Sequence, residues 1–243
     1  MNLTRGSLSL VIGLALLFAG PSTASAIVQP PDVDPADFTP SQVIDNQYFP
    51  LPVGRLFVYE GTKEGVSTRD EVCVTHEPKV IEGVQITVVH HRTFAGSSLV
   101  LVEDTKDWFA QDVRGNVWYF GEDTIEFPGG STEGSWEAGV GDADAGFVML
   151  ADPQVGDRYY QEFARNVAED QAKVESLVSA CIHNQRDCFD HLLLTKETSR
   201  LDPGVVENKY YGATVGFILG VNVKGGDERT ELVDITTGNC SSR

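Results

Sequence analysis

Apolar and polar residues alternate in short runs along most of the chain. The runs are rich in β-branched and aromatic residues, and Gly, Pro, Asn and Asp interrupt them about every ten residues, which is typical of β-strands joined by turns. Helical patterns of the length that a parallel β-α-β sheet requires are missing. The pattern predicts an all-β fold: a single antiparallel meander, closed as a barrel or curled as a clam-like sheet, with at most one short helix. Strands are expected at residues 55–60, 70–76, 84–91, 99–105, 107–111, 116–120, 158–163, 192–197, 206–211, 216–221 and 228–235.

The segment ARNVAEDQAKVESLVSA, residues 164–180, fits two kinds of element. Val167, Gln171, Val174 and Val178 would fall near one face of a helix, whereas residues 173–178 alternate as a strand does. We expect a short helical turn over residues 167–172 that leads into a strand.

The stretch DWFAQDVRGNVWYFGED, residues 107–123, predicts a hairpin rich in aromatic residues. Asp112 and Gly115 stand first and fourth in DVRG, which suits a type I turn followed by a glycine in the left-handed region. The turn then sets Asp112 opposite Asn116. The remaining cross-strand pairs are expected to be Gln111 with Val117, Ala110 with Trp118, Phe109 with Tyr119, and Trp108 with Phe120.

Alternation along the two strands divides this hairpin into two faces. One face carries Trp108, Ala110, Trp118 and Phe120, and it is expected to be core. The other face carries Asp107, Phe109, Gln111, Val117 and Tyr119. A curled sheet can place such a mixed face in a cavity, where Asp107, Phe109, Gln111 and Tyr119 would bind a small ligand. The alternative is an ordinary aromatic cross-strand pair on a half-exposed face.

Several blocks of the chain resemble a family of uncharacterised exported bacterial proteins. NQYFPLPVGRLFVYEG (46–61) is similar to the opening of that family, and DWFAQDVRGNVWYFGED is similar to its central motif. The blocks GSWEAGVGDADAGFVMLADPQVGDRYYQEF (134–163) and ENKYYGATVGFILG (207–220) resemble later parts. The resemblance implies a single exported domain and implies no activity. The sequence departs from the family at residues 148–151, where a proline is usual, and in the two cysteines around IHNQRD.

The first 26 residues have the composition of a secretory signal peptide. Arg5 precedes an apolar run over residues 8–19, and Ala24-Ser25-Ala26 has the small-x-small form of a cleavage site. Residues 27–45 contain four prolines and predict an extended, poorly packed leader. Residues 46–243 are expected to form one β domain. No apolar run after the signal is long enough to span a membrane as a helix, so we expect a soluble periplasmic or extracellular protein.

The charge of the chain argues against some partners. It has 36 acidic residues against 18 Lys and Arg, a formal net charge of -18. Such a charge disfavours nucleic acids and anionic membrane surfaces, and it favours cations or basic partners.

Four cysteines in an exported chain predict two disulfides. Cys181 and Cys188 bracket a loop that one bridge could close, and Cys73 would then pair with Cys240. Ligation of zinc by this loop together with His183 and His191 is the rival interpretation, although the spacing is not that of a familiar zinc site.

Acidic residues crowd around the hairpin, and oxygen clusters of this kind can bind calcium. The candidate ligands are Asp104, Asp112, Glu122 and Asp123, and GDADAG with Asp142 and Asp144 is a second candidate. Neither has the complete spacing of an EF-hand loop. Solvated turns are the simpler interpretation of both.

Catalytic signatures are sparse: the chain has no G-x-S-x-G, no H-E-x-x-H and no phosphate-binding loop. Hydrolysis by two carboxyl groups could use Glu133, Glu137 or Glu162, but their spacing selects none of them. The sequence therefore favours an exported binding protein for a small amphiphile, a cation or a protein partner. The alternatives are a carboxylate-dependent hydrolase and a structural envelope or matrix protein.

Overall fold

The computed structural model describes residues 29–40 and 43–237, so the expected signal peptide lies outside the described residues. The described chain is all-β: besides strands it contains only a short 3-10 helix, η1 (Pro35–Asp37). Fourteen strands belong to one antiparallel sheet. They are β1 (Arg55–Lys63), β2 (Val66–Ile81), β3 (Val84–Ala95), β4 (Val100–Gln111), β5 (Val117–Glu126), β6 (Trp136–Glu137), β7 (Ala143–Met149), β8 (Arg158–Tyr160), β9 (Glu162–Ala164), β10 (Asp170–Ile182), β11 (Asp187–Ser199), β12 (Val206–Gly212), β13 (Gly216–Lys224) and β14 (Arg229–Thr237).

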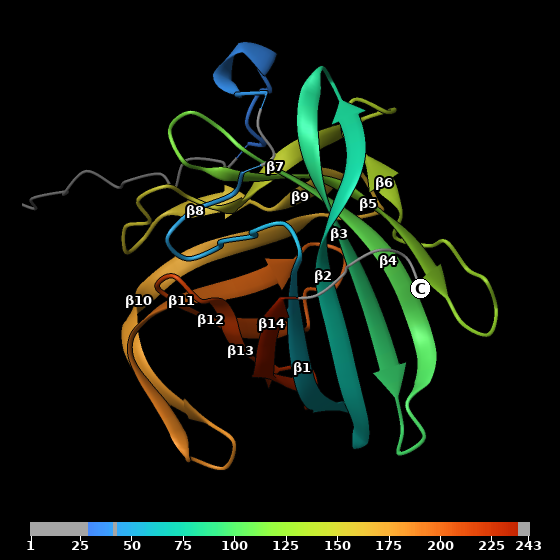
Figure 1. The fold of residues 1–243 in the computed structure, drawn as a ribbon, viewed down its shortest axis with the longest axis vertical. Coiled ribbons are helices and arrows are strands. Elements are labelled where there is room, and N and C mark those ends of the chain that lie inside the picture. Colours follow the sequence, from blue (N-terminus) through green and yellow to red (C-terminus); the bar gives the residue numbers. More distant parts are fainter. Residues whose placement is uncertain (1–28, 41–42, 238–243) are drawn as a thin grey trace, which may run out of the picture.

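The sheet is a meander that curls into a nearly closed barrel. Strands β1 to β5 pair in chain order, β7 follows β5, and β10 to β14 pair in chain order. The first strand, β1, also pairs with the last, β14, through residues such as Phe57 opposite Ile235. In Figure 1, β1–β4 form a wall at the right and β10–β13 a wall at the left, while β7–β9 lie across the top.

One short strand region closes the circle between the two walls. β8 pairs with β10 and β9 pairs with β7, although only Gln161 separates β8 from β9. The amide of Gln161 donates to the carbonyl of Asp170 over 2.8 Å. A Cβ atom on Gly146 of β7 would lie 2.4 Å from the carbonyl oxygen of Gln161, so only glycine allows this approach. We call residues 158–164 the seam.

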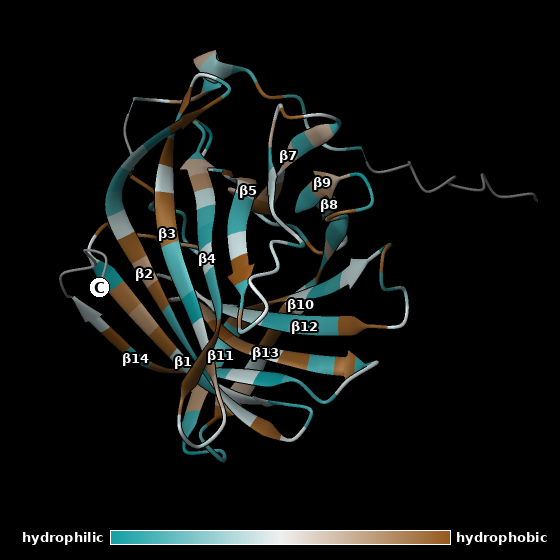
Figure 2. Ribbon diagram, turned by 90° about the vertical axis from the view of Figure 1, so that its right-hand side faces the viewer, coloured by the Kyte–Doolittle hydropathy of each residue, from teal (hydrophilic) through white to brown (hydrophobic). Residues whose placement is uncertain are grey.

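The hairpin of β4 and β5 has the expected turn and the expected two faces. The amide of Gly115, at φ 96°, donates to Asp112, and Gln111, Ala110 and Phe109 pair with Val117, Trp118 and Tyr119. Every side chain of the first face is buried: Trp108, Ala110, Trp118 and Phe120. Bands of hydrophobic and hydrophilic residues alternate along the strands, as this pattern requires (Figure 2).

The N-terminal segment covers part of that first face. Phe38 packs edge-on against Trp118, with ring centroids 5.5 Å apart, and against Phe120 at 5.8 Å. Ile44 is 2% exposed. The segment is therefore more closely packed than its prolines indicate, because apolar residues between the prolines reach the hairpin.

Beyond Phe109 and Tyr119 the predicted register is wrong. The next cross-strand pair is Asp107 with Glu122, so β5 carries one more residue than β4 at this point. Gly121 adopts φ 122° there, a conformation that favours glycine and is typical of a β-bulge. Simple alternation would place Gly121 and Asp123 on the same face as Tyr119. The extra residue places Glu122 on that face instead.

Replacing Gly121 by alanine is expected to destabilise the protein. The new Cβ atom would lie 2.1 Å from the carbonyl oxygen of Trp136 on β6, and φ would remain in the left-handed region. Urea unfolding should show a loss of about 2 kcal/mol or more. Gly129 is the matched control, since a Cβ atom there meets nothing within 4 Å. Equal losses at both positions would contradict the bulge.

Three other expectations differ from the structure. No helix forms over residues 167–172: Ala164–Ala168 is a turn closed by a bridge, and β10 begins at Asp170. The strands expected at 99–105 and 107–111 are one continuous strand, β4. The calcium candidate GDADAG leads into β7, where Asp144 pairs with Phe163. In each case pairing with a neighbouring strand decides the conformation over local composition.

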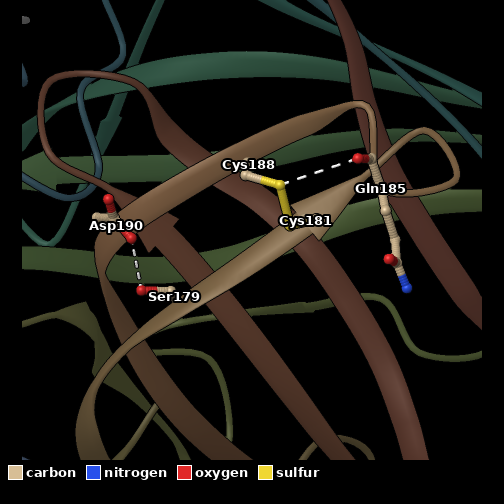
Figure 3. The surroundings of a disulfide bond; sticks show 5 residues. All are labelled: Ser179, Cys181, Gln185, Cys188 and Asp190. Atoms are coloured by element: carbon tan, nitrogen blue, oxygen red, sulfur yellow. Dashed lines mark hydrogen bonds between the residues drawn. A yellow bond between two sulfur atoms is a disulfide. The ribbon is translucent and has the colours of Figure 1, made fainter.

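Cys181 and Cys188 form the expected disulfide, between paired residues at the end of the β10–β11 hairpin (Figure 3). Ser179 donates to Asp190 across the same hairpin over 2.6 Å. Cys73 is disulfide-bonded as well, whereas Cys240, its expected partner, lies outside the described residues. Zinc ligation by the 181–188 loop is wrong, because a disulfide sulfur has no thiolate to offer.

Among the described residues no helix is long and apolar enough to cross a membrane.

Candidate functional site

An open cavity of about 510 Å³ lies between the two walls of the barrel. Its lining comes from β1–β5 on one side, from β10–β14 on the other, and from the seam, from β7 and from the segment before β1. The lining is unusual in its charge. It includes the acids Asp70, Glu103, Asp107, Glu122, Glu162, Asp170, Glu197, Glu207 and Glu228, against the bases Lys63, His91 and Lys209.

Tyr119 links two of these acids. Its hydroxyl lies 2.7 Å from Asp107 and 3.1 Å from Glu122. The bulge at Gly121 makes this arrangement, because it brings Glu122 to the face that carries Tyr119. One phenol proton can satisfy only one of the two carboxylates at a time. The other acid is therefore favoured in its protonated form.

Burial shifts the titration of this group. Desolvation, followed by the charge of Asp107, raises the pKa of Glu122 to about 8. Desolvation also raises the pKa of Asp107, although His91 and the bond from Tyr119 oppose the shift. Both shifts favour the neutral carboxyl group. Glu122 is thus held protonated near neutral pH.

Glu162 and Asp170 extend the acidic region from the seam. Desolvation raises the pKa of Glu162 well above its usual range, and the charges of Asp170 and Glu122 raise it further. Desolvation also raises the pKa of Asp170. We call Asp107, Glu122, Glu162 and Asp170 the acidic cluster.

Lys209 on β12 is already paired with acids. Its ammonium group lies 2.8 Å from Glu197 and 3.5 Å from Glu207. Burial alone would lower the pKa of Lys209, but the two carboxylates raise it well above its usual range. Glu197 also accepts hydrogen bonds from Thr195 and Tyr211, over 2.9 and 3.3 Å. This lysine is therefore a fixed positive charge with satisfied partners.

His91 on β3 supplies a second positive charge. Its Nε2 lies 3.2 Å from Asp70. Burial would lower the pKa of His91, but the bond to Asp70 and the charges of Asp107 and Glu103 raise it to about 9. His91 is therefore an imidazolium at neutral pH.

Six aromatic side chains form an unbroken series of ring contacts around the cavity. Phe109 stacks on Tyr119, with centroids 4.8 Å apart, and Phe49 lies 5.5 Å from Phe109. Tyr211 continues the series at 6.4 Å from Phe49, and Phe217 follows at 5.8 Å. Tyr59 ends it, 5.3 Å from Phe217. We call these residues the aromatic band: Tyr119, Phe109, Phe49, Tyr211, Phe217 and Tyr59, all of which line the cavity.

Three of the four expected ligand-binding residues line this cavity: Asp107, Phe109 and Tyr119. Gln111 is not among the lining residues. Its side chain instead accepts hydrogen bonds from the amides of Asp45 and Asn46, each over 2.9 Å, and donates to Asp45. Gln111 therefore anchors the N-terminal segment to the hairpin.

The expected calcium ligands do not come together. Asp104 lies 2.6 Å from His90, and Asp123 pairs with Lys106 across the strands, whereas Glu122 faces the cavity. Asp112 stays in the hairpin turn, where it accepts from the amides of Arg114 and Asn116, the side chain of Asn116 and the indole of Trp118. No group of three His, Cys, Asp or Glu in the described part of the chain is arranged to hold a metal.

The carboxylates considered for hydrolysis are separated as well. Glu137 forms an ion pair with Lys79 over 2.8 Å and is not a lining residue, while Glu162 is one. The sequence interpretation missed Glu207 and Lys209, although they share a face with Tyr211 at every second position of a predicted strand. Ionisable residues at every second position of a strand indicate a polar face, and this pattern could have identified Glu207 and Lys209.

Comparison with known proteins gives remote likenesses. No family model matches the chain, and no curated protein does. A crystal structure from Bacteroides fragilis, described as an exported protein with a YmcC-like fold, is 13% identical with a TM-score of 0.42, over 79% of this chain and 99% of its own. A structure from Parabacteroides distasonis, described as a lipoprotein, is 13% identical with a TM-score of 0.41, over 79% and 100%. At these values neither bears on the chemistry of the cavity.

Proposed function

We propose that this chain is an exported binding protein that takes a small molecule into the cavity of its barrel. The observation that carries the proposal is the convergence of ionisable and aromatic side chains, from both walls, on one cavity of about 510 Å³. The volume of this cavity lies within the roughly 300–1,000 Å³ that is usual for small-ligand sites. A purely structural protein gains nothing from acids held inside its barrel, since their burial is unfavourable.

Export is supported by the chain itself. Residues 1–26 have the composition of a signal peptide, and disulfides such as Cys181–Cys188 persist in oxidising compartments outside the cytoplasm. We place the protein in the periplasm or outside the cell.

A carboxylate-dependent hydrolase is the second candidate, and one observation favours it. Tyr119 joins Asp107 and Glu122, and the pKa of Glu122 is raised to about 8 by burial. A carboxyl group that is protonated near neutral pH can donate a proton to a leaving group. The acid would then be Glu122, not Glu137, because Glu137 is paired with Lys79 away from the cavity.

Native mass spectrometry tests the binding function. The mature protein, purified from its own host, is expected to carry an added mass that survives EDTA and is lost on denaturation. An added mass that EDTA removes would indicate a metal instead. A bare protein mass would contradict the proposal. Conversion of the extracted molecule to a product by fresh protein would favour the hydrolase.

A further inference from the structure

We propose, building on the binding function above, that the ligand is a small organic cation: an ammonium group that sits in the acidic cluster and carries an apolar body against the aromatic band. Tyr119 of the band joins it to the cluster, because its hydroxyl bonds to Asp107 and Glu122 while its ring stacks on Phe109. A single molecule of modest length could therefore reach both.

The charge balance of the cavity supports a cation. Each basic side chain that lines it already has an acidic partner: Lys63 lies 3.5 Å from Glu228, His91 3.2 Å from Asp70, and Lys209 2.8 Å from Glu197. These pairings leave the acidic cluster without an ion-pair partner among the described residues. A bound ammonium group would supply a positive charge there and would favour the ionised form of acids that burial otherwise keeps protonated.

Glu162 is the residue most in need of a partner. Its side chain is half-buried and lines the cavity, and no hydrogen bond or ion pair among the described residues engages it. Desolvation and the charges of Asp170, Glu122 and Asp107 raise the pKa of Glu162, and only the charge of Lys209, which is itself paired with Glu197, lowers it. A ligand that donates hydrogen bonds would give this cavity-lining carboxyl group the partner that the protein does not supply.

The aromatic band suits the rest of such a ligand. Aromatic faces attract cations through their quadrupole, and they also bury an apolar body. Phe49 and Phe109 have no polar group that the ligand would have to satisfy.

The same walls disfavour other classes of ligand. An anion would meet the acidic cluster and find both Lys209 and His91 occupied. A neutral polyol carries no charge, so it would not favour the ionised form of the cluster as an ammonium group does. A calcium ion needs about six to eight oxygens at short distance. No such metal-holding group is present among the described residues.

Isothermal titration calorimetry with three probes of one shape tests the inference. The mature protein, after exhaustive dialysis, is titrated at pH 7.5 with benzylamine, benzyl alcohol and benzoate, and separately with calcium. Benzylamine is expected to bind about tenfold or more tightly than benzyl alcohol, and benzoate is expected to give no heat. Benzylamine should also release protons, because its charge favours the ionised form of the cluster. Proton release is read from the heat in two buffers of different ionisation enthalpy.

Two isosteric variants locate the site. Glu162→Gln is expected to weaken benzylamine about 30-fold or more and to remove part of the proton release. Glu137→Gln is the matched control, since Glu137 is paired with Lys79 outside the cavity. This variant should leave the benzylamine affinity and the proton release unchanged. Thermal unfolding of each variant shows whether it is folded. A folded Glu162→Gln protein with unchanged affinity would overturn the inference.

The remaining outcomes separate this inference from the binding function. Equal binding of benzyl alcohol and benzylamine, or tighter binding of benzoate, overturns the cationic class but leaves small-molecule binding in place. Binding of calcium without benzylamine overturns it in favour of a metal. If no probe binds, the inference fails, and native mass spectrometry decides about the binding function. A retained organic mass preserves that function, whereas a bare protein removes both.

Discussion

Replacing Trp118 by alanine is expected to lower the free energy of unfolding by about 3–5 kcal/mol, the range for removing a large buried aromatic side chain. Trp118 is 2% exposed. Its ring contacts Phe147 at 4.4 Å and Phe38 at 5.5 Å, and its indole donates to Asp112 over 3.0 Å. Urea unfolding measures the loss. The variant should also loosen the N-terminal segment, because Phe38 loses its principal ring partner, and limited proteolysis reports that change.

Trp118→Phe is the control for this experiment. It keeps an aromatic ring against Phe38 and removes the bond to Asp112, so it should cost less than the alanine variant. If Trp118→Ala costs less than about 1 kcal/mol, Trp118 does not belong to the core of the protein.

Stability is expected to fall as the pH rises from about 5 to 9. The pKa of Glu122 is near 4.5 in the unfolded chain and about 8 in the folded one, so the folded state holds the extra proton between these values. His91 acts in the same direction between 6.5 and about 9. A state that binds more protons loses stability when protons are removed, by about 1.4 kcal/mol per pH unit for each proton.

Urea unfolding across this pH range measures the slope. The groups that set the titration of Glu122 are Asp107, Tyr119, Glu103 and His91. Glu122→Gln should flatten the slope below pH 8, and Glu137→Gln should leave it as it is. A stability that increases with pH in this window would show that the buried acids are ionised in the folded protein.

Alternation and turn chemistry predicted most of the sheet. The strands around Val84, Val206 and Gly216 begin where the sequence indicates, because β-branched runs between turn residues have few alternative conformations. Among the strands that the sequence did not predict, β7 begins in GDADAG, where small residues indicate a turn. Packing explains the smallest of these residues: Gly146 has no side chain, and the backbone of the seam at Gln161 occupies the space that a Cβ atom would need. Such packing depends on a partner distant in sequence.

The site was predicted only where local sequence determines it. Phe109 and Tyr119 followed from the hairpin register, which local turn residues determine. Glu122 appeared only as a calcium candidate, because the bulge that turns it inward depends on Gly121. Glu162 and Asp170 meet the hairpin through the seam. No periodicity along the chain connects them to Asp107, since they come from strands that are far apart in sequence.

The pairing of β1 with β14 also bears on how the protein folds. Residues 55–62 pair with residues 229–237, so nearly the whole described chain separates the partners. Contacts between residues so far apart carry a large entropic cost of loop closure, and folds built on them form slowly. The other pairings join strands that are close in sequence and can form as the chain emerges. Until β14 arrives, β1 and β13 present open edges, and the cavity has no complete wall. The ability to hold a ligand should therefore arise in the final step of folding.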